Sequence, residues 1–531
     1  MVFIRRVVSR GYTYAQLVHT ERVGTKVRTK VIKHLGPWNK LGDIFSKPLA
    51  EEIDNFACFD HGAVTILHNV CEELCFQPII NSNIFKGAGL QPGVLSEIII
   101  LSHCVNPTSK VMIPDWFYQT TLPDSLNITA QQINKDNLTK ILDYYTDKKI
   151  EHIHNAIVDR LIELFGISKD CLMYDITSTY FEGNKCEDAV FGYSRDGKRG
   201  TRQVNFGLLV SRIGKFPMLF RYFKGNTVDV TTVSETALKA KEILQLTKTS
   251  IVMDRGMLSD DNVKDLDGLE LDYIICLKRT SDIIKKMCAI QVGQCKVVDD
   301  EKKLYAHEHI EQHNGKEKKY VICISKPKQE EDKEKREEKL KKVDEKLCQL
   351  QKKIGKRTYK DRDEIVAKRG EILKGVKKYF KIEHPKEELA FTFERNTKEI
   401  IQQEQLDGKY AILCSDPETA MKEIVEVYKD KDKAEKAFRV IKSYIHVRPI
   451  RHWKPQRVKA HIFLCVLAYL VQKVLEYKYD DQQKTTAQQL LYNLKGIKKI
   501  VYSAGKHKFE KLTELNEVQI HILKKLGHFP L

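Results

Sequence analysis

The sequence lacks the usual marks of exported, paired-cysteine and membrane-spanning proteins. Its 13 cysteines include no CxxC pair. Cys71 and Cys75 follow His68, but we expect buried, reduced thiols of an amphipathic helix there rather than metal ligands. The first residues, MVFIRRVVSRGY, contain no apolar segment long enough for a signal peptide. The longest apolar stretch, residues 462–471, is too short to cross a bilayer and predicts a core helix. We therefore expect a protein of the reducing cytoplasm without a membrane partner.

Acidic residues are fewer than basic ones. The chain has 72 Asp and Glu against 90 Lys and Arg, which gives a net charge of +18. This excess favours a polyanionic partner, most simply nucleic acid, although an ordinary basic protein could have the same balance. The 531 residues suffice for two to four domains.

Two carboxylates lie within or at the end of short apolar segments that predict strands. Asp175 lies within CLMYDITSTYF (171–181), and Asp254 ends the run Ile251 to Met253 before a helix start at Ser259 or Asp260. Taken singly, each is more often a turn or capping residue. An acid on a buried strand is costly unless something pairs with it, and a divalent cation would do so.

A third carboxylate stands in a spaced helical pattern. Tyr428, Lys431, Glu435 and Lys442 have the form Y-x2-K-x3-E-x6-K, which places them on one face of a single helix. Alone, this pattern could be a solvated face. With Asp175 and Asp254 upstream, it indicates a metal ion held beside a phosphate backbone.

The order of two strand acids and one helix acid resembles the DDE-type insertion-sequence transposases, whose signature is Y-x2-R-x3-E-x6-K. The resemblance extends from about residue 165 to 475, apart from a charged central segment. It includes residues 192–210 and 224–232 between the two aspartates, and residues 14–36 resemble the N-terminal lead-in of the family. Lys431 departs from the pattern, because it keeps the charge of arginine but not its planar fork.

The resemblance implies an α/β fold, with an RNase H-like mixed sheet flanked by helices. It also implies that Asp175, Asp254 and Glu435 are both the catalytic residues and the ligands of two Mg²⁺ ions, for which Mn²⁺ can substitute. Water would cut the DNA and the freed 3′-OH would attack target DNA, without a covalent role for Tyr428. The implied partners are terminal inverted repeats, target DNA and a second copy of the chain in a synaptic homodimer. Cytoplasmic, nucleoid-associated action is expected. Acids ranked lower as ligands are Glu182, Glu187, Asp188 and Asp229.

Basic residues continue after Glu435 in HVRPIRHWKPQRVKAH (446–461), around a tryptophan. Cations interleaved with an aromatic suit DNA backbone contact and base stacking, although a basic loop leading into a core helix remains the alternative. The candidate DNA-binding residues are Tyr428, Lys431, Lys442, Arg448, Arg451, Trp453, Lys454 and Arg457.

The remaining patterns suggest six segments. They are a β-rich module (1–48), a helical DNA-binding domain (49–165), the first part of the core (166–280), an insertion (281–409), the second part of the core (410–480) and a helical tail (481–531). In the first, a turn at Gly24 precedes a strand in which Val27, Thr29 and Val31 form a half-buried face. In the second, residues 94–105 predict a helix that ends before Asn106-Pro107.

The insertion contains a heptad seam at Leu340, Val343, Leu347, Leu350 and Ile354. A second amphipathic stretch, from Ile365 to Phe380, could fold back on it as a helical hairpin between strands at 320–325 and 410–415. The hairpin could brace the domain, track DNA or dimerise.

Two alternative functions remain open at this point. One is an RNase H-like nuclease that cuts without joining strands. The other is a non-catalytic DNA-binding protein derived from a transposase, which retention of all three acids argues against.

Overall fold

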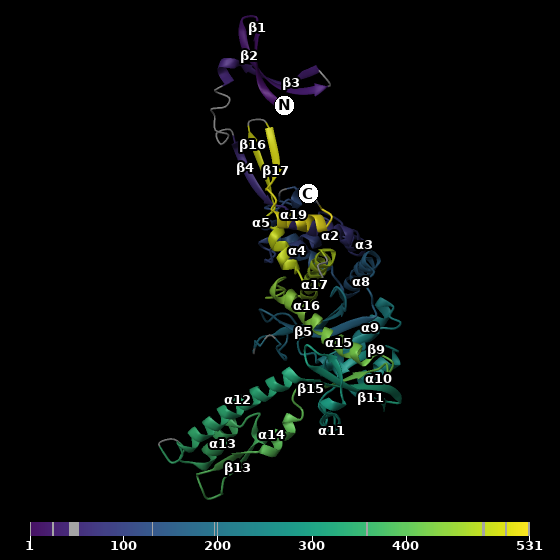
Figure 1. Cartoon of the computed structure of the whole chain (residues 1–531), viewed down its shortest axis with the longest axis vertical. Coiled ribbons are helices and arrows are strands. Elements are labelled where there is room, and N and C mark those ends of the chain that lie inside the picture. Colours follow the sequence, from purple (N-terminus) through teal and green to yellow (C-terminus); the bar gives the residue numbers. More distant parts are fainter. Residues whose placement is uncertain are drawn as a thin grey trace. The chain divides into compact units, whose positions relative to one another are not determined.

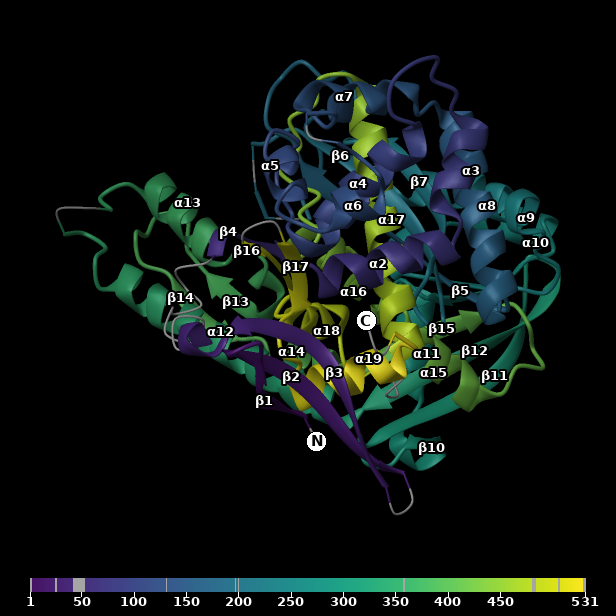
Figure 2. The ribbon, with the colours of Figure 1, turned by 90° about the horizontal axis from the view of Figure 1, so that it is seen from above.

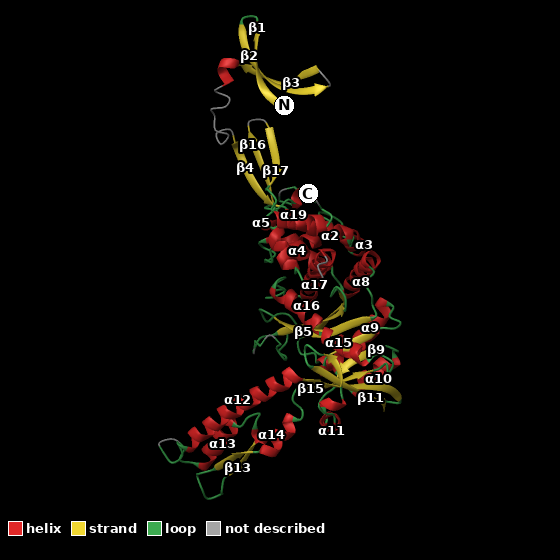
Figure 3. Cartoon of the chain, viewed as in Figure 1, coloured by secondary structure: helices red, strands yellow, loops and turns green. Residues whose placement is uncertain are grey.

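The protein is described here from a computed structural model covering residues 2–23, 26–41, 53–129, 131–195, 197–198, 200–356, 359–479, 484–504 and 507–528. The chain forms two compact units, shown as ribbons in Figure 1 and by secondary structure in Figure 3. The first unit contains 1–66, 114–131 and 484–531, and the second contains 67–113 and 132–483. The predicted turn at Gly24 and the predicted boundaries at 48 and 480 lie outside the described residues.

The first unit contains two three-stranded antiparallel sheets. The strands of the first are β1 (Val2–Ser9), β2 (Tyr12–Val23) and β3 (Lys26–Pro37), and those of the second are β4 (Ile53–Asp60), β16 (Lys498–Ala504) and β17 (His507–Leu512). The β-rich N-terminal module is therefore confirmed. The half-buried face predicted for β3 is confirmed only at Val31. Val27 and Thr29 are exposed on this edge strand, and burial is concentrated at Ala15 and Val18 of central β2.

The C-terminal tail differs from the helical prediction. Its helices α18 (Ala487–Leu494) and α19 (Glu517–Lys525) flank the β16–β17 hairpin, whose inner strand pairs with β4 from the other end of the sequence. Such pairing is set by tertiary contacts rather than by local periodicity. Three further helices belong wholly or partly to this unit: α2 (Gly62–Glu73), α5 (Ile113–Phe117) and α6 (Leu122–Ser125).

The second unit is built on a nine-stranded sheet in the order β10-β11-β12-β15-β9-β8-β5-β6-β7. The central strand β5 is parallel to β8 and antiparallel to β6, β8 is parallel to β9, and β6 is antiparallel to β7. This is the predicted RNase H-like mixed sheet, extended on one side by four antiparallel strands. The bounds are β5 (Cys171–Tyr180), β6 (Gln203–Ser211), β7 (Pro217–Lys224), β8 (Ser250–Met253), β9 (Asp272–Cys276), β10 (Lys296–Asp299), β11 (Leu304–His313), β12 (Lys316–Ser325) and β15 (Lys409–Cys414).

Helices cover both faces of this sheet. On one side, α8, α9 and α10 lie next to one another (Figure 2), with Lys239 of α9 3.7 Å from Glu151 of α8. On the other side, α15 and α16 pack over the central strands, and α17 packs against α4, α16 and β7. The helix bounds in this unit are α3 (Phe76–Asn83), α4 (Pro92–Val105), α7 (Lys135–Lys140), α8 (Asp147–Phe165), α9 (Val233–Leu244), α10 (Asp260–Gly268), α11 (Ser281–Ala289), α15 (Met421–Asp430), α16 (Asp432–Ser443) and α17 (Pro455–Tyr479).

The predicted core helix is confirmed as α17. By length and hydropathy α17 could also cross a membrane, but 94% of its apolar window is buried inside the protein, as in the core helix of a globular domain. The predicted helix at 94–105 is α4. His68 lies 2.5 Å from Glu97, and Cys71 is buried on α2 as expected. Cys75 differs from the prediction, because it lies between α2 and α3 and is only partly buried.

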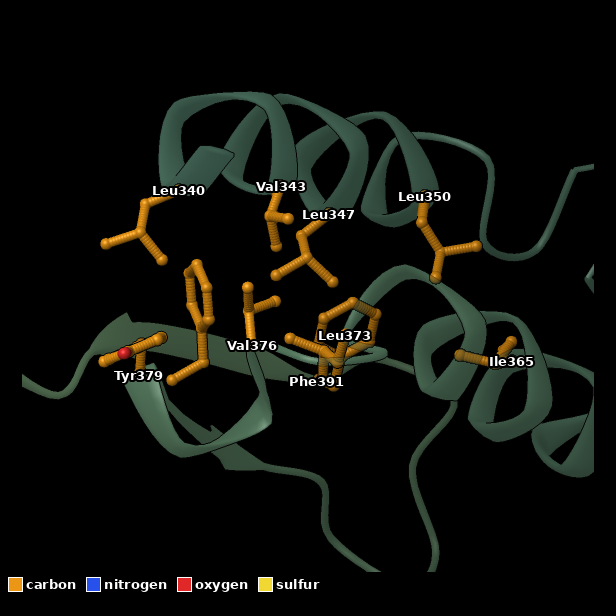
Figure 4. Close-up of a cluster of buried hydrophobic side chains, with 10 residues drawn as sticks. Leu340, Val343, Leu347, Leu350, Ile365, Leu373, Val376, Tyr379 and Phe391 are labelled. Carbon is orange, nitrogen blue, oxygen red and sulfur yellow. The ribbon is translucent and has the colours of Figure 1, made fainter. Parts of the chain in front are cut away.

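The insertion folds around its own small core (Figure 4). The heptad residues from Leu340 to Leu350 on α12 (Lys326–Gln351) pack against Ile365 of α13 (Arg362–Ile372), together with Leu373 and Phe391. The predicted hairpin is therefore present. Three further elements complete it: β13 (Phe380–Glu383), β14 (Thr392–Arg395) and α14 (Thr397–Glu404). Because β10 to β12 belong to the large sheet, the added segment is shorter than the predicted 281–409.

Candidate active site

Three carboxylates from three elements meet at one pocket. Asp175 lies in the middle of β5, Asp254 directly follows the parallel neighbour β8, and Glu435 lies in the first turns of α16, which packs on β5. All three line a pocket of about 390 Å³. The structure therefore brings together acids that lie far apart in the sequence.

The alternation of side chains along β5 aims Asp175 into this pocket. Its neighbour Tyr174 points to the opposite face, where its hydroxyl lies 2.9 Å from Thr232 and 3.1 Å from Thr236. The Asp175 carboxylate accepts a hydrogen bond of 2.8 Å from the N–H of Ile176. Burial raises the pKa of Asp175 to about 7, and Glu435 adds to this rise, so the carboxylate has too little positive charge around it.

Asp254 is better compensated than Asp175. It accepts a 2.8 Å hydrogen bond from the N–H of Arg255, and the Lys431 ammonium lies 3.1 Å away. Burial acts to raise the pKa of Asp254, but Lys431 and the Arg255 N–H outweigh it and hold the pKa below its ordinary value.

The helical signature is divided between two helices, which corrects the prediction of a single continuous one. Lys431 is the junction residue between α15 and α16. Its N–H bonds to the Tyr428 carbonyl and its own carbonyl accepts from Ala434, both three residues apart, so the helix is tightened locally. Lys431 also lies 3.8 Å from Glu435, and its ammonium therefore contacts two of the three acids.

Lys442, in the last turn of α16, is joined to the strand that carries Asp175. Its ammonium donates a 2.6 Å hydrogen bond to the hydroxyl of Thr177 on β5, and both residues line the pocket. A cation is thereby held at the edge of the acid cluster, where a phosphate could reach it.

Tyr428 packs beside the site and does not line the pocket. It is half-buried, with its ring 6.0 Å from that of Tyr410 and 5.8 Å from the Lys431 ammonium. Burial raises the pKa of its hydroxyl, so the phenol stays protonated. This environment agrees with the expectation that it is no nucleophile.

Sequence reasoning missed one ion pair at the pocket. Arg195 and Asp229 both line it and bind each other, and the Arg195 N–H donates to Ser178 on β5. Asp229 begins the short 3-10 helix η4 (Asp229–Thr232). From the sequence alone, it ranked below the three acids as a metal ligand. Both residues do lie in the two blocks between the aspartates that resemble the family, and that position was the available signal.

The basic segment after α16 lines a second cavity, of about 780 Å³. Arg451 is bonded to Glu182 at 3.2 Å, Trp453 is 60% exposed, and the Lys185 ammonium lies 5.1 Å from the centre of the Trp453 ring. The basic residues that line the cavity are Lys110, Lys135, Arg448, Arg451 and Arg457, and Trp453 lines it with them.

Two of the candidate DNA-binding cations are already paired with one acid. Arg457 binds Asp143 through two hydrogen bonds of 2.7 and 2.5 Å, and Lys454 lies 3.4 Å from the same carboxylate. By contrast, the Arg448 guanidinium lies over the ring of Tyr180, at the end of β5, at 5.4 Å. Arg448 thus connects the second cavity with the strand of Asp175.

The donor set of the first pocket fits a divalent cation. Its three acids offer only oxygen ligands, and the raised pKa of Asp175 shows a buried carboxylate that lacks sufficient positive charge. Oxygen-only donors are those preferred by Mg²⁺ and Mn²⁺.

Two family profiles match the chain. The profile of a family described as "Transposase DDE domain" matches residues 167–471, more than half of the chain. A second profile, "IS1634 family transposase, N-terminal domain", matches residues 4–57. A comparison with curated protein sequences found no match.

Two solved structures are similar to the chain. One, titled a piggyBac transposase synaptic complex with hairpin DNA, has 9% sequence identity and a TM-score of 0.40, over 88% of this chain and 81% of that one. The other, a Mos1 transposase paired-end complex with left transposon end, has 8% identity and a TM-score of 0.15, over 36% of this chain and 60% of that one.

Proposed function

Because the chain belongs to the DDE transposases of insertion sequences, we propose that it binds the inverted-repeat ends of its element, cleaves the DNA there and joins the 3′ ends to target DNA. The observation that carries this proposal is the meeting of Asp175, Asp254 and Glu435, from β5, β8 and α16, at one pocket.

In the proposed reaction, Asp175, Asp254 and Glu435 would hold the divalent ions. When bound, Mg²⁺ would supply an activated water and stabilise charge at the phosphate. Asp175 is the most desolvated of the three carboxylates, so it would gain most from a bound cation. Mn²⁺ would serve in the same oxygen-donor site.

The cations around the pocket position the DNA strand. Lys442, held by Thr177, would bind a phosphate next to the scissile bond, and Lys431 would turn from the acids towards phosphate once metal neutralises them. After cleavage, the 3′-OH stays in the same pocket and attacks a phosphodiester of the target DNA, whose own 3′-oxygen leaves as the new bond forms. Tyr428 forms no covalent bond to DNA in this scheme.

The second cavity would hold DNA beyond the scissile phosphate. Its lining of arginines and lysines around an exposed tryptophan supports contacts with backbone and bases. We further propose that two copies of the chain pair the two element ends, and that the protein acts on DNA in the cytoplasm.

The test is metal-dependent cleavage of DNA that carries the element's ends. Asp175→Asn, Asp254→Asn and Glu435→Gln should each reduce the cleavage rate by about 100-fold or more, because each removes a metal ligand. Asp432→Asn is the matched control, since Asp432 is an exposed acid on the same helix that does not line the pocket. Near-normal cleavage by one of the three variants would remove that residue from the mechanism.

The same assay separates the alternatives. Joined products on a target plasmid support transposition, whereas cut ends without joining would indicate a nuclease. DNA binding without any metal-dependent cleavage would indicate a non-catalytic relative.

A further inference from the structure

Two histidines and a cysteine form a buried cluster away from the three acids. His103 lies on α4, and His461 and Cys465 lie one turn apart on α17, so they share a face of that helix. One nitrogen of each ring and the cysteine sulfur all lie within 4.8 Å of one another. All three residues are buried, and the two imidazole rings are 5.5 Å apart.

Backbone carbonyls fix which nitrogen of each ring is available. Nδ1 of His103 lies 2.8 Å from the Ile445 carbonyl, and Nε2 of His461 lies 2.9 Å from the Val447 carbonyl. Because a carbonyl can only accept, each of these nitrogens carries the hydrogen. The lone pairs therefore lie on Nε2 of His103 and Nδ1 of His461. A histidine whose second nitrogen donates to a backbone carbonyl is the arrangement that orients metal-binding imidazoles.

The second ring nitrogen of His103, Nε2, makes no hydrogen bond to any of the described residues. His103 is 3% exposed, and its Nε2 has no hydrogen-bond partner there. Burial lowers the pKa of His103 to about 3, so the ring is neutral and this lone pair is unprotonated. A buried polar atom without a partner is uncommon, and a bound ion is one explanation for it.

Lys110 is in direct contact with the cluster. Its ammonium lies 3.2 Å from Nδ1 of His461 and is the only cation bonded to the cluster among the described residues. His103, His461 and Lys110 line the 780 Å³ cavity, which gives an ion a route of entry from solvent. His452 packs next to His461, with 5.6 Å between the ring centres.

We propose that His103, His461 and Cys465 bind a Zn²⁺ ion, distinct from the ions of the carboxylate pocket. Two imidazole nitrogens and one thiolate suit Zn²⁺ and are poor ligands for Mg²⁺. On binding, the Cys465 thiol releases its proton to solvent and its sulfur bonds to the metal. Lys110 leaves the cluster, and water from the cavity completes a tetrahedral set.

This ion would fix the segment that leaves the catalytic helix. The two carbonyls that orient the histidines belong to Ile445 and Val447, directly after α16 and directly before Arg448. A metal bridging α4 and α17 would therefore hold the start of the basic segment in place. This role is structural, and it does not depend on the proposed DNA chemistry.

The test uses the full-length protein, stripped with chelator and reloaded with Co²⁺ or Zn²⁺. Beside any ions in the carboxylate pocket, we expect one equivalent of tightly held metal per chain and, with Co²⁺, a thiolate-to-metal charge-transfer band in the near ultraviolet. Cys465→Ser should abolish the band. Cys323→Ser is the matched control and should keep it, because Cys323 is equally buried, on β12, and burial raises the pKa of each thiol to about 12.

Two further variants keep the test decisive if Cys465→Ser does not fold. An Asp175→Asn, Asp254→Asn double variant should retain the band, since it alters only the carboxylate pocket. Lys110→Met should tighten Zn²⁺ binding by about tenfold or more, because it removes a competing cation from His461. Absence of the band in the wild-type protein, or Zn²⁺ affinity unchanged by Lys110→Met, would overturn the proposal and leave Lys110 as the natural occupant.

Discussion

At the scale of single residues, Lys431 stands where the signature that the sequence resembles has arginine. Its ammonium lies 3.1 Å from Asp254 and 3.8 Å from Glu435. A compact ammonium on a flexible stem can satisfy two carboxylates that do not form one planar pair, which the rigid fork of arginine does less easily. The substitution therefore fits an acid cluster that needs compensation when no metal is bound.

Asp143 forms ion pairs with two nearby cations, Lys454 and Arg457. Hydrogen bonding by Arg457 is the main reason that its pKa lies below the ordinary value. Because this pKa is lower in the folded state, the pair stabilises the protein above the unfolded pKa, about 3.9, and the stabilisation is lost as pH falls through the folded pKa.

We expect Asp143→Asn to lower the free energy of unfolding by about 1 kcal/mol at neutral pH. The difference from wild type should shrink as the pH falls below about 4. Urea unfolding at several pH values measures both effects. A difference that stays constant down to pH 2 would mean that the ion pair does not stabilise the fold.

At the scale of elements, the insertion is a self-contained unit. Its apolar core lies between α12 and α13 (Figure 4) and uses residues of the insertion itself. The segment leaves β12 and returns into β15, which are antiparallel neighbours, and the N–H of Ser325 donates to the Gly408 carbonyl at 2.9 Å. The ends of the insertion are therefore adjacent.

We predict that residues 326–407 can be replaced by Asn-Gly, which would close β12 and β15 as a two-residue hairpin. The variant should fold, with secondary structure that circular dichroism can verify and a modestly lower thermal midpoint. Retained cleavage would support a bracing role, whereas folded protein with lost DNA binding or lost dimerisation would assign that role to the insertion. Failure to fold would show that the core depends on it.

A point substitution provides the control for this deletion. Leu347→Ala should cost about 2–5 kcal/mol, because Leu347 is fully buried in α12. Hydrogen exchange should speed up in α12 and α13 and remain unchanged in β5. Faster exchange in β5 would contradict the independence of the insertion.

At the scale of the whole molecule, the net charge of +18 predicts steep salt dependence of DNA binding. If six to ten phosphates are neutralised, affinity should fall by about 10³–10⁵ between 50 and 200 mM salt. Arg451→Ala, at an exposed cation of the second cavity, should lower the logarithmic salt slope by about one. Lys264→Ala is the control, because Lys264 is exposed on α10 and lines neither cavity. A flat salt response would argue against a backbone-dominated interface.

Much of the fold was predictable because it follows from local patterns of apolar residues in the sequence. The short apolar run around Asp175, the heptad seam from Leu340 and the apolar stretch at 462–471 each correspond to an observed element. Predictions failed where burial depends on distant partners. The exposed Val27 of β3 and the C-terminal hairpin that pairs with β4 are examples.

The sequence by itself determined which chemical groups the protein carries: three acids in strand and helix contexts, a cationic excess and a short helical hairpin. Only the tertiary structure decided which groups meet. Asp175, Asp254 and Glu435 converge because β5 and β8 are neighbours and α16 packs on β5. Arg195 with Asp229, and His103 with His461, pair across segments whose separation no local periodicity encodes. Helix and strand periods specify the face of one element, whereas the packing of the whole core specifies which faces come together.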